Sequence, residues 1–421
     1  MKTTQSWKAF SISTIALNKT VLQVIPTMDL GGAERTTVEM TRAIVAAGGR
    51  AIVATSGGRL CDDVIACGGE VERLPVASKN PLVIWQNIER LRSLFDRRQV
   101  DLVHVRSRAP AWSCLFAAQK SRLPLVTTYH GAYGGQSSFK RFLNSSMVRS
   151  DRVIANSEFT AGAIAVNYKD VENRMITIPR GADLTQFCPS KIGCERILKL
   201  EKDWGISRKG SPDPGRNIFL MPARMSEWKG HKLVISALKR LKEGHFYKNS
   251  PDSVGATGQR RKLTVVFVGD DEAGAEYVES LQSEIEEFGV REMTSFVGHC
   301  ADMPAAYSLA DAVLSPSLRP EAFGRVAVEA GAMSKIAIVA DHGGARETVV
   351  DGVTGFRHRP ADSEDLARKM ANVLEMPRSM LDQMGDAARD NVQRNFSIDA
   401  MTNATLKVYA SLLDASGGLK R

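Results

Sequence analysis

Short apolar runs alternate with helical patterns along most of the chain, and this alternation constrains the fold more than any other feature. The first series of apolar runs covers residues 21–25, 51–55, 71–74, 102–105, 125–129, 153–155 and 175–178. The second series covers residues 218–222, 263–268, 294–297, 312–314 and 336–340. Strand-length apolar runs separated by helices predict parallel sheets with helices on both faces. We therefore predict an α/β fold.

The length of the chain predicts two domains, because 421 residues exceed the size at which one core stops growing. We expect a flexible leader over 1–20, a first domain over 21–190, a linker over 191–216 and a second domain over 217–396. A last helix over about 397–415, with Ser397 as its N-cap, is expected to pack back onto the first domain. Two α/β domains imply a cleft between them, where ligands usually bind.

Positive charge is concentrated in one part of the sequence. The net charge is +9, and residues 80–152 hold twelve Lys and Arg against four acids. Within this segment, Lys140, Arg141 and Arg149 alternate with aromatic and aliphatic residues at helical spacing. This pattern favours an anionic membrane surface as partner. A helix with its apolar side in the core and its charges in water gives the same pattern, and is more common. Nucleic acid is a poorer partner, because no reading-helix or RNA-sheet motif accompanies the charge.

The six cysteines are scattered, without a C-x-x-C pair or a Cys/His cluster. This pattern argues for a reducing compartment and against a disulfide framework or a zinc site. No apolar run reaches the eighteen or so residues of a membrane span. We therefore expect a cytoplasmic protein without a metal site. If the basic segment binds lipid, the protein would be located peripherally on the inner face of the cell membrane.

Three loops that follow predicted strands carry residues suited to ligand chemistry. Gly31 and Gly32 form a turn before a helix, where the backbone can approach a phosphate. His130 follows the strand at 125–129 and could donate a hydrogen bond or move a proton. Arg224 and Lys229 leave the strand at 218–222 just before a helix, so two cations could converge on a diphosphate. Each loop also has an ordinary structural explanation. Gly31 and Gly32 could form a tight βα turn, His130 could be a structural histidine, and Arg224 and Lys229 could be surface charges at a helix start.

Glu321 and Glu329 flank a break between a strand and a helix. The backbone between them, through Ala322, Phe323 and Gly324, provides N–H groups at a helix start, where a polyhydroxylated or phosphorylated ligand can bind. Eight residues of helix span about 12 Å, too far for both carboxylates to act on one bond. We interpret them as two separate clamps on one elongated ligand, with an ordinary αβ corner as the alternative.

Taken in order, these pieces resemble a family 4 glycosyltransferase of GT-B fold, built of two Rossmann-like α/β/α domains. The resemblance extends from residue 21 to the last helix. It rests on Gly31-Gly32, His130-Gly131, the turn at 178–183, Arg224 with Lys229-Gly230, the run 296–298, Glu321 with Glu329, and the run 351–356.

The resemblance implies transfer of a sugar, with retention, from a nucleotide-diphosphate sugar to an acceptor hydroxyl. It implies a metal-independent transferase of the hexosyltransferase type (EC 2.4) that needs no cofactor, since the nucleotide sugar is a substrate. By similarity, His130 lies against the reacting sugar, and the first domain binds a glycan or glycolipid acceptor. The donor would be held by Gly31 and Gly32, by Arg224 and Lys229 at the diphosphate, by Glu321 with Ala322, Phe323 and Gly324 at the sugar, and by Glu329 at the ribose.

One residue departs from the family pattern, and other functions stay open. Arg180 stands where many members carry Asn, so its role is left undecided. A nucleotide-sugar epimerase or a phosphorylase of the same architecture is the alternative enzyme, and a non-enzymatic scaffold on a membrane is the third. The basic surface favours envelope polysaccharide or lipopolysaccharide core as acceptor. The donor base, the sugar and the linkage are not specified by these residues.

Overall fold

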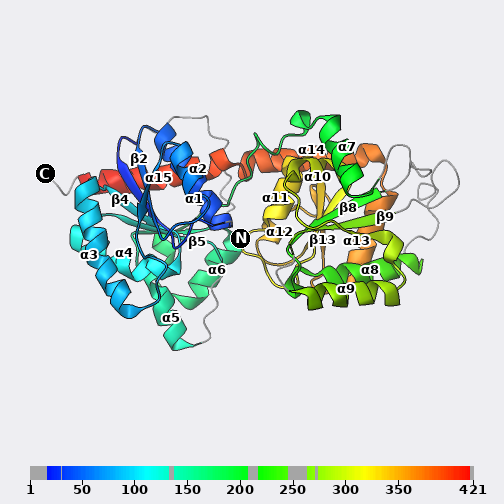
Figure 1. Cartoon of the computed structure of the whole chain (residues 1–421), viewed down its shortest axis with the longest axis horizontal. Coiled ribbons are helices and arrows are strands. Elements are labelled where there is room, and N and C mark those ends of the chain that lie inside the picture. The colour runs from blue at the N-terminus through cyan, green and yellow to red at the C-terminus, as the bar shows by residue number, and fades with distance from the viewer. Residues whose placement is uncertain are drawn as a thin grey trace, which may run out of the picture. The chain divides into compact units, whose positions relative to one another are not determined.

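The computed structural model describes residues 17–29, 31–131, 137–206, 217–244, 263–270 and 274–417. It divides into two compact units (Figure 1): unit 1 is Met1–Arg180 with Ile398–Arg421, and unit 2 is Gly181–Ser397. Each unit is built on one parallel sheet. The predicted α/β fold with parallel sheets is therefore confirmed.

The sheet of unit 1 has the order β3-β2-β1-β4-β5-β6-β7. Its strands are β1 (Thr20–Val24), β2 (Arg50–Thr55), β3 (Glu70–Arg73), β4 (Leu102–Val105), β5 (Leu125–Tyr129), β6 (Arg152–Ala155) and β7 (Met175–Thr177). The direction of the strand order reverses between β1 and β4, which pair from Val21↔Leu102 to Val24↔Val105. Ligands of open α/β sheets bind beyond the carboxyl ends of the strands at such a reversal.

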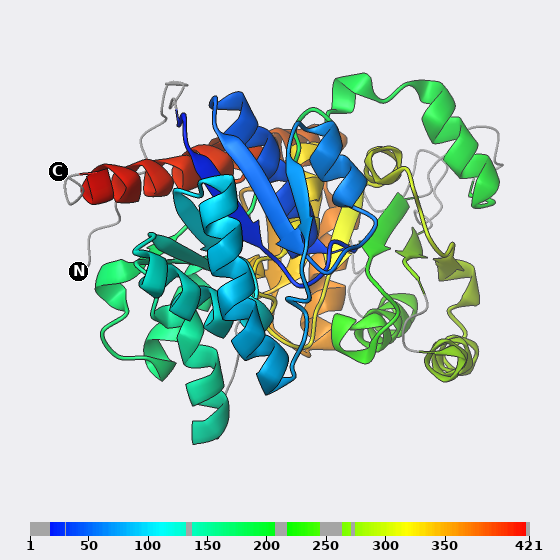
Figure 2. The same cartoon turned by 60° about the vertical axis from the view of Figure 1, so that its left-hand side comes forward.

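Helices cover both faces of this sheet. They are α1 (Gly32–Ala46), α2 (Cys61–Ala66), α3 (Pro81–Arg98), α4 (Arg108–Ser121), α5 (Ser138–Asn144), α6 (Glu158–Asn167) and α15 (Ile398–Gly417), with short 3-10 turns η1 (Ser145–Val148) and η2 (Glu172–Arg174). On one face, Leu91, Leu94 and Leu115 pack against the strands. On the other face, α1 lies beside α15, which is the red helix of Figure 2. Met40, Ile44 and Tyr409 of these two helices belong to one buried apolar cluster.

The sheet of unit 2 has the order β10-β9-β8-β11-β12-β13. Its strands are β8 (Asn217–Pro222), β9 (Leu263–Val268), β10 (Thr294–Phe296), β11 (Ala312–Ser315), β12 (Ile336–Ala340) and β13 (Gly355–His358). The order reverses between β8 and β11, which pair at Ala312↔Phe219 and Val313↔Leu220. The edge strand β13 was not predicted from the sequence.

The helices of unit 2 again lie on both faces of the sheet and bury two apolar clusters against it. They are α7 (Cys194–Asp203), α8 (His231–Lys242), α9 (Ala275–Glu287), α10 (Met303–Leu309), α11 (Arg325–Ala332), α12 (Ala345–Thr348), α13 (Ser363–Glu375) and α14 (Arg378–Asn395), with 3-10 turns η3 (Pro189–Lys191), η4 (Glu227–Lys229) and η6 (Arg291–Met293).

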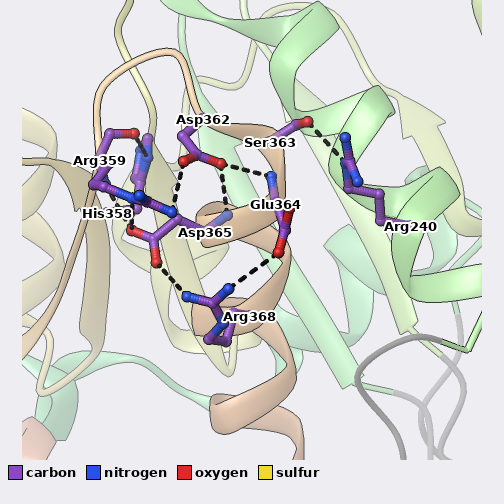
Figure 3. A network of polar contacts seen from close by, with 8 residues as sticks. All are labelled: Arg240, His358, Arg359, Asp362, Ser363, Glu364, Asp365 and Arg368. Atoms are coloured by element: carbon purple, nitrogen blue, oxygen red, sulfur yellow. Dashed lines mark hydrogen bonds and ion pairs between the residues drawn. The ribbon is translucent and has the colours of Figure 1, made fainter.

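A polar network fixes the start of α13 beside the end of β13 (Figure 3). The Asp362 carboxylate caps the helix by accepting from the backbone N–H groups of Glu364, at 3.0 Å, and Asp365, at 2.9 Å. Arg368 donates to both of these acidic side chains at 3.2 Å. The capping bonds to Asp365 and Glu364 lower the pKa of Asp362, so the cap carries its charge at neutral pH.

The flanking segments differ in part from the expectation. Most of the predicted leader lies outside the described residues, but Leu17 is buried and β1 begins at Thr20. The segment predicted as a linker, 191–216, contains helix α7 over its described part. Leu200 of this helix and Ile206 after it are buried in a core cluster of unit 2.

Candidate active site

The loops that follow β8 and β11 bring Lys229 and Glu321 into contact in unit 2. Lys229 Nζ donates to Glu321 Oε1 at 2.8 Å, and the two side chains are 16% and 12% exposed. Ser317 Oγ donates to the same carboxylate oxygen. The Lys229 ammonium also lies 4.2 Å from the centroid of the Trp228 ring. The two residues that the sequence assigned to different parts of a donor therefore form one ion pair, at the reversal of the strand order.

Glycines allow the two loops to approach this closely. Gly230 has φ +87°, and a Cβ there would lie 2.3 Å from the carbonyl oxygen of Pro316. The backbone N–H of Leu318 donates to the carbonyl of Trp228 at 2.7 Å. Because only glycine combines this conformation with so close a contact, Gly230 fixes the Lys229 loop against the loop after β11.

A second backbone contact fixes Glu321 from the side of β12. Gly343 has φ +63°, and a Cβ on it would lie 2.6 Å from the Glu321 carbonyl oxygen and 2.8 Å from its nitrogen. The N–H of Gly344 donates to that carbonyl oxygen at 2.7 Å, and His342 Nε2 donates to the carbonyl of Ser317 at 2.7 Å. The loop that carries Glu321 is thus bonded to its neighbour along its length.

The Glu329 side chain on α11 is 14% exposed and is held by two donors. Tyr307 Oη donates to Glu329 Oε2 at 2.9 Å, and Arg325 Nε donates to Glu329 Oε1 at 2.7 Å. Burial, and then the Glu329 carboxylate, raise the pKa of Tyr307, so its hydroxyl stays protonated and donates. Each oxygen of Glu329 keeps a second lone pair with which to accept from a ligand hydroxyl.

The backbone from Ala322 to Gly324 lies at the start of α11. Gly324 caps the helix with φ +88°. The Phe323 side chain is 5% exposed and packs edge-on against Phe396 at 5.9 Å, so its ring belongs to the core and only its backbone can serve a ligand. Arg224 is exposed in the loop after β8.

In unit 1, the glycine turn, His130 and Arg180 come together. A Cβ on Gly32 would lie 2.4 Å from Arg180 Nη1. Arg180 Nη2 lies 2.8 Å from His130 Nδ1, and since a guanidinium can only donate, Nδ1 accepts. Gly31 precedes α1 as its N-cap with an extended backbone. Arg180, whose role the sequence left open, is therefore the residue that joins the glycine turn to His130.

His130 is a neutral ring with its proton on Nε2. Burial lowers the pKa of His130 well below its usual range, and the neighbouring Arg180, Arg106 and His104 lower it further. Because Nδ1 accepts from Arg180, the proton of the neutral ring is on Nε2. His130 can thus donate one hydrogen bond through Nε2.

Sequence reasoning missed Arg106 and Asn156, which follow β4 and β6 as His130 follows β5. Both are buried, at 2% and 1% exposure. They line a hollow in unit 1 together with His130 and Arg180. The sequence could have indicated these two residues, because each is a polar residue directly after a buried strand. The carboxyl ends of parallel strands lie at one edge of the sheet, so such residues come close together.

Lys140, Arg141 and Arg149 are exposed on and after α5, as expected for a surface segment. Phe139 and Phe142 on the same helix are 69% and 55% exposed. Arg149 lies 5.5 Å from the ring of Trp112, which packs against Phe142. This surface therefore combines exposed aromatic rings with positive charge.

Two family models match the chain: Glycosyltransferase Family 4 over residues 30–186 and Glycosyl transferases group 1 over residues 203–391. A glycosyltransferase from Rickettsia africae ESF-5 is 30% identical, with a TM-score of 0.83 over 94% of this chain and 99% of its own. Trehalose synthase of Pyrococcus horikoshii is 26% identical over 340 residues, which are 80% of this chain and 74% of its own. Anabaena HepE in complex with UDP is 22% identical and shares the fold, with a TM-score of 0.76 over 93% of this chain and 100% of its own.

These similarities and the two parallel α/β units define a glycosyltransferase of the GT-B class. The chain belongs to glycosyltransferase family 4. The family and the fold class predicted from the sequence are confirmed, and so is a transferase activity in the broad sense.

No three His, Cys, Asp or Glu side chains of the described part of the chain are grouped as metal ligands. Among the same residues, no helix has the length and apolar character needed to cross a membrane.

Proposed function

We propose that this protein is a retaining glycosyltransferase that moves a sugar from a nucleotide-diphosphate sugar to an acceptor hydroxyl. The observation that carries the proposal is the Lys229–Glu321 pair at the reversal of the unit 2 sheet, where a cation and a carboxylate stand side by side. The UDP complex of HepE, a protein of the same fold, supports a nucleotide-diphosphate donor. Envelope polysaccharide or lipopolysaccharide core is the proposed acceptor class, on the basis of the basic surface of unit 1.

In the proposed reaction, the bond between the anomeric carbon and the diphosphate oxygen breaks, and the acceptor oxygen bonds to that carbon from the same face. The acceptor proton passes to the departing diphosphate oxygen, so no separate base is required. Lys229 and Arg224 stabilise the negative charge that develops on the diphosphate. A fixed donor at a developing oxyanion contributes about 3–4 kcal/mol to such a step.

Glu321 has two roles in this proposal. Its Oε1 holds the Lys229 ammonium at 2.8 Å, and its remaining lone pairs accept from sugar hydroxyls. Glu329 accepts from the ribose diol of the donor. We propose that these protein groups suffice and that neither a metal ion nor a cofactor takes part.

A donor screen with a matched variant tests the proposal. We expect one of the UDP-, GDP- or ADP-sugars to raise the Tm of the wild type, and Lys229→Ala to weaken this binding about tenfold or more, because a charge-assisted bond is lost. Transfer to an acceptor should continue in EDTA. Loss of activity in EDTA that Mg²⁺ restores would contradict the metal-free proposal, and turnover of the nucleotide sugar without acceptor would indicate an epimerase.

We further propose that unit 1 binds an anionic membrane surface through α5. The support is the combination of exposed Phe139 and Phe142 with Lys140 and Arg141 on one short helix. Aromatic rings can insert at the headgroup level while the cations contact anionic lipid. Such a location would bring the enzyme to a lipid-linked acceptor.

Vesicle sedimentation measures this binding. The protein should sediment with vesicles of equal parts phosphatidylglycerol and phosphatidylcholine at low salt, and much less as salt rises. Phe139→Ser with Phe142→Ser should remove most of the bound fraction. Ile65→Ser changes a 58% exposed residue of α2 and should bind like the wild type, because Figure 1 draws this helix on the opposite side of unit 1 from α5. Equal binding of all three proteins, or none at low salt, would contradict the proposal.

A further inference from the structure

Four neighbouring strands of unit 1 direct polar side chains to one place. Side chains two residues apart in a strand point to the same face of a sheet. The pairs concerned are His104 and Arg106, Thr128 and His130, and Ile154 and Asn156, at the ends of β4, β5 and β6, while Ile178 and Arg180 follow the end of β7. All eight residues line one small hollow, which α1 and α15 complete.

Two of the lining residues, His104 and Arg106, take part in a buried hydrogen-bond network. His104 contacts Tyr409 Oη through Nδ1 at 2.5 Å and Thr128 Oγ1 through Nε2 at 2.7 Å. Arg106 Nη1 donates to Gln23 Oε1 at 3.1 Å and lies 3.4 Å from His104 Nδ1. This network fixes the orientation of the Arg106 guanidinium through its Nη1 atom.

Donors on the open side of the hollow have no partner in the protein. Arg106 Nε, both amide atoms of Asn156 and His130 Nε2 are buried and make no hydrogen bond. A buried polar group without a hydrogen bond is unfavourable, because it has lost its contact with water and gained no partner. Such a group is therefore expected to have a ligand or an ordered water. Three donating groups on three adjacent strands converge on the same small space.

The charge of the hollow is positive. Arg106 is 2% exposed and, among the described residues, forms no ion pair, while Tyr409 and the more distant carboxylates of Glu39 and Glu34 offset part of its charge. Arg180 adds a second guanidinium at the rim, bonded to His130. Burying a cation without a directly bonded anion is costly, so an anion that enters the hollow from outside would stabilise the arrangement.

We propose that this hollow binds an anionic oxygen group, a phosphate or a carboxylate, of a substrate. Arg106, Asn156 and the Nε2–H of His130 donate to its oxygens. The Oδ1 atom of Asn156 accepts from a hydroxyl of the same group or of the adjacent sugar. The space admits a group of about the size of one water, so an anionic oxygen enters it and the sugar ring stays outside.

The assignment to a substrate rests on the proposed glycosyl transfer, but binding of the anion does not. The anionic group has two possible sources, the diphosphate of the donor and an acidic substituent of the acceptor. Both offer the same oxygens to the same donors. The experiment therefore separates binding of an anion from its origin.

The test measures the Tm of the full-length protein against inorganic phosphate, with sodium chloride at matched ionic strength as reference. Phosphate should raise the Tm of the wild type in a concentration-dependent way. Asn156→Asp should stay folded and lower the phosphate affinity at least about tenfold, because a carboxylate beside the guanidiniums replaces the anion. Asn156→Ala should weaken binding without adding a charge. Lys120→Ala removes an exposed cation of α4 that does not line the hollow, so it is the matched control and should keep the phosphate response.

Binding of UDP to the same proteins identifies the source. If Asn156→Asp weakens UDP binding as much as phosphate binding, the anion belongs to the donor; if UDP binds as in the wild type, it belongs to the acceptor. A phosphate response that is absent in the wild type, or equal in Asn156→Asp, means that the hollow holds only water and overturns the proposal. A protein that binds phosphate here yet transfers no sugar would contradict the proposed function alone.

Discussion

Glu321→Gln should lower kcat/KM by about a hundred- to a thousandfold while the protein stays folded, the range seen when one oxyanion-hole donor is removed. The amide has the shape of the carboxylate and can still accept from Ser317, but it no longer carries the charge that holds Lys229 at 2.8 Å. In the proposed mechanism, this change weakens the hydrogen bonds to the sugar hydroxyls and displaces the Lys229 ammonium from the departing diphosphate. The loss should therefore fall mainly on kcat.

The stability of the variants separates a catalytic from a structural role. Glu321→Ala removes the partner of a lysine that is only 16% exposed, and should cost about 1–3 kcal/mol of unfolding free energy in addition to activity. Glu287→Gln, at an exposed end of α9 in the same unit, should match the wild type in activity and in Tm. A folded Glu321→Gln enzyme within about threefold of wild-type kcat/KM would remove Glu321 from the site.

The sequence predicted the sheets well because each buried parallel strand is a nearly continuous apolar run. It failed at β13, whose residues Gly355–His358 include two polar side chains on an edge strand. It also failed at α7, where the helical pattern of Ile197, Leu200 and Leu198 lies between segments rich in Pro, Gly and charge. Both failures concern short elements at the edge of a unit, where tertiary contacts outweigh local pattern.

The candidate site shows the same limit at the level of side chains. Position in the chain was enough to place Lys229 and Glu321 after the ends of two predicted strands. It did not show that the strands are neighbours or that the two side chains bind each other across 92 residues of sequence. Phe323 was expected to serve the ligand through its backbone, and the sequence did not show that its ring belongs to the core. Arg106 and Asn156 were missed because their significance depends on the residues of neighbouring strands, which the sequence does not pair.

Gly343→Ala should lower both stability and activity, because the methyl group would meet the backbone that carries Glu321. The new Cβ would lie 2.6 Å from the Glu321 carbonyl oxygen and 2.8 Å from its nitrogen, and backbone atoms cannot rotate away as a flexible side chain can. The positive φ of +63° adds strain for a residue with a side chain. We expect a loss of about 2–4 kcal/mol in unfolding free energy, from strain and overpacking together.

The effect on catalysis follows from the displacement of Glu321. Relief of the contact must shift this loop or break the bond from the Gly344 N–H to the Glu321 carbonyl, and a shift of about 1 Å at a positioned group can lower kcat about a hundredfold. Gly205→Ala is the matched control, because Gly205 has φ +64° but nothing within 4 Å of its Cβ position. It should lose only about 1–2 kcal/mol and keep its activity. Urea unfolding and kcat/KM, measured on both variants, separate the loss of stability from the loss of activity. A Gly343→Ala enzyme that is destabilised yet fully active would show that the position of the Glu321 backbone is not required for transfer.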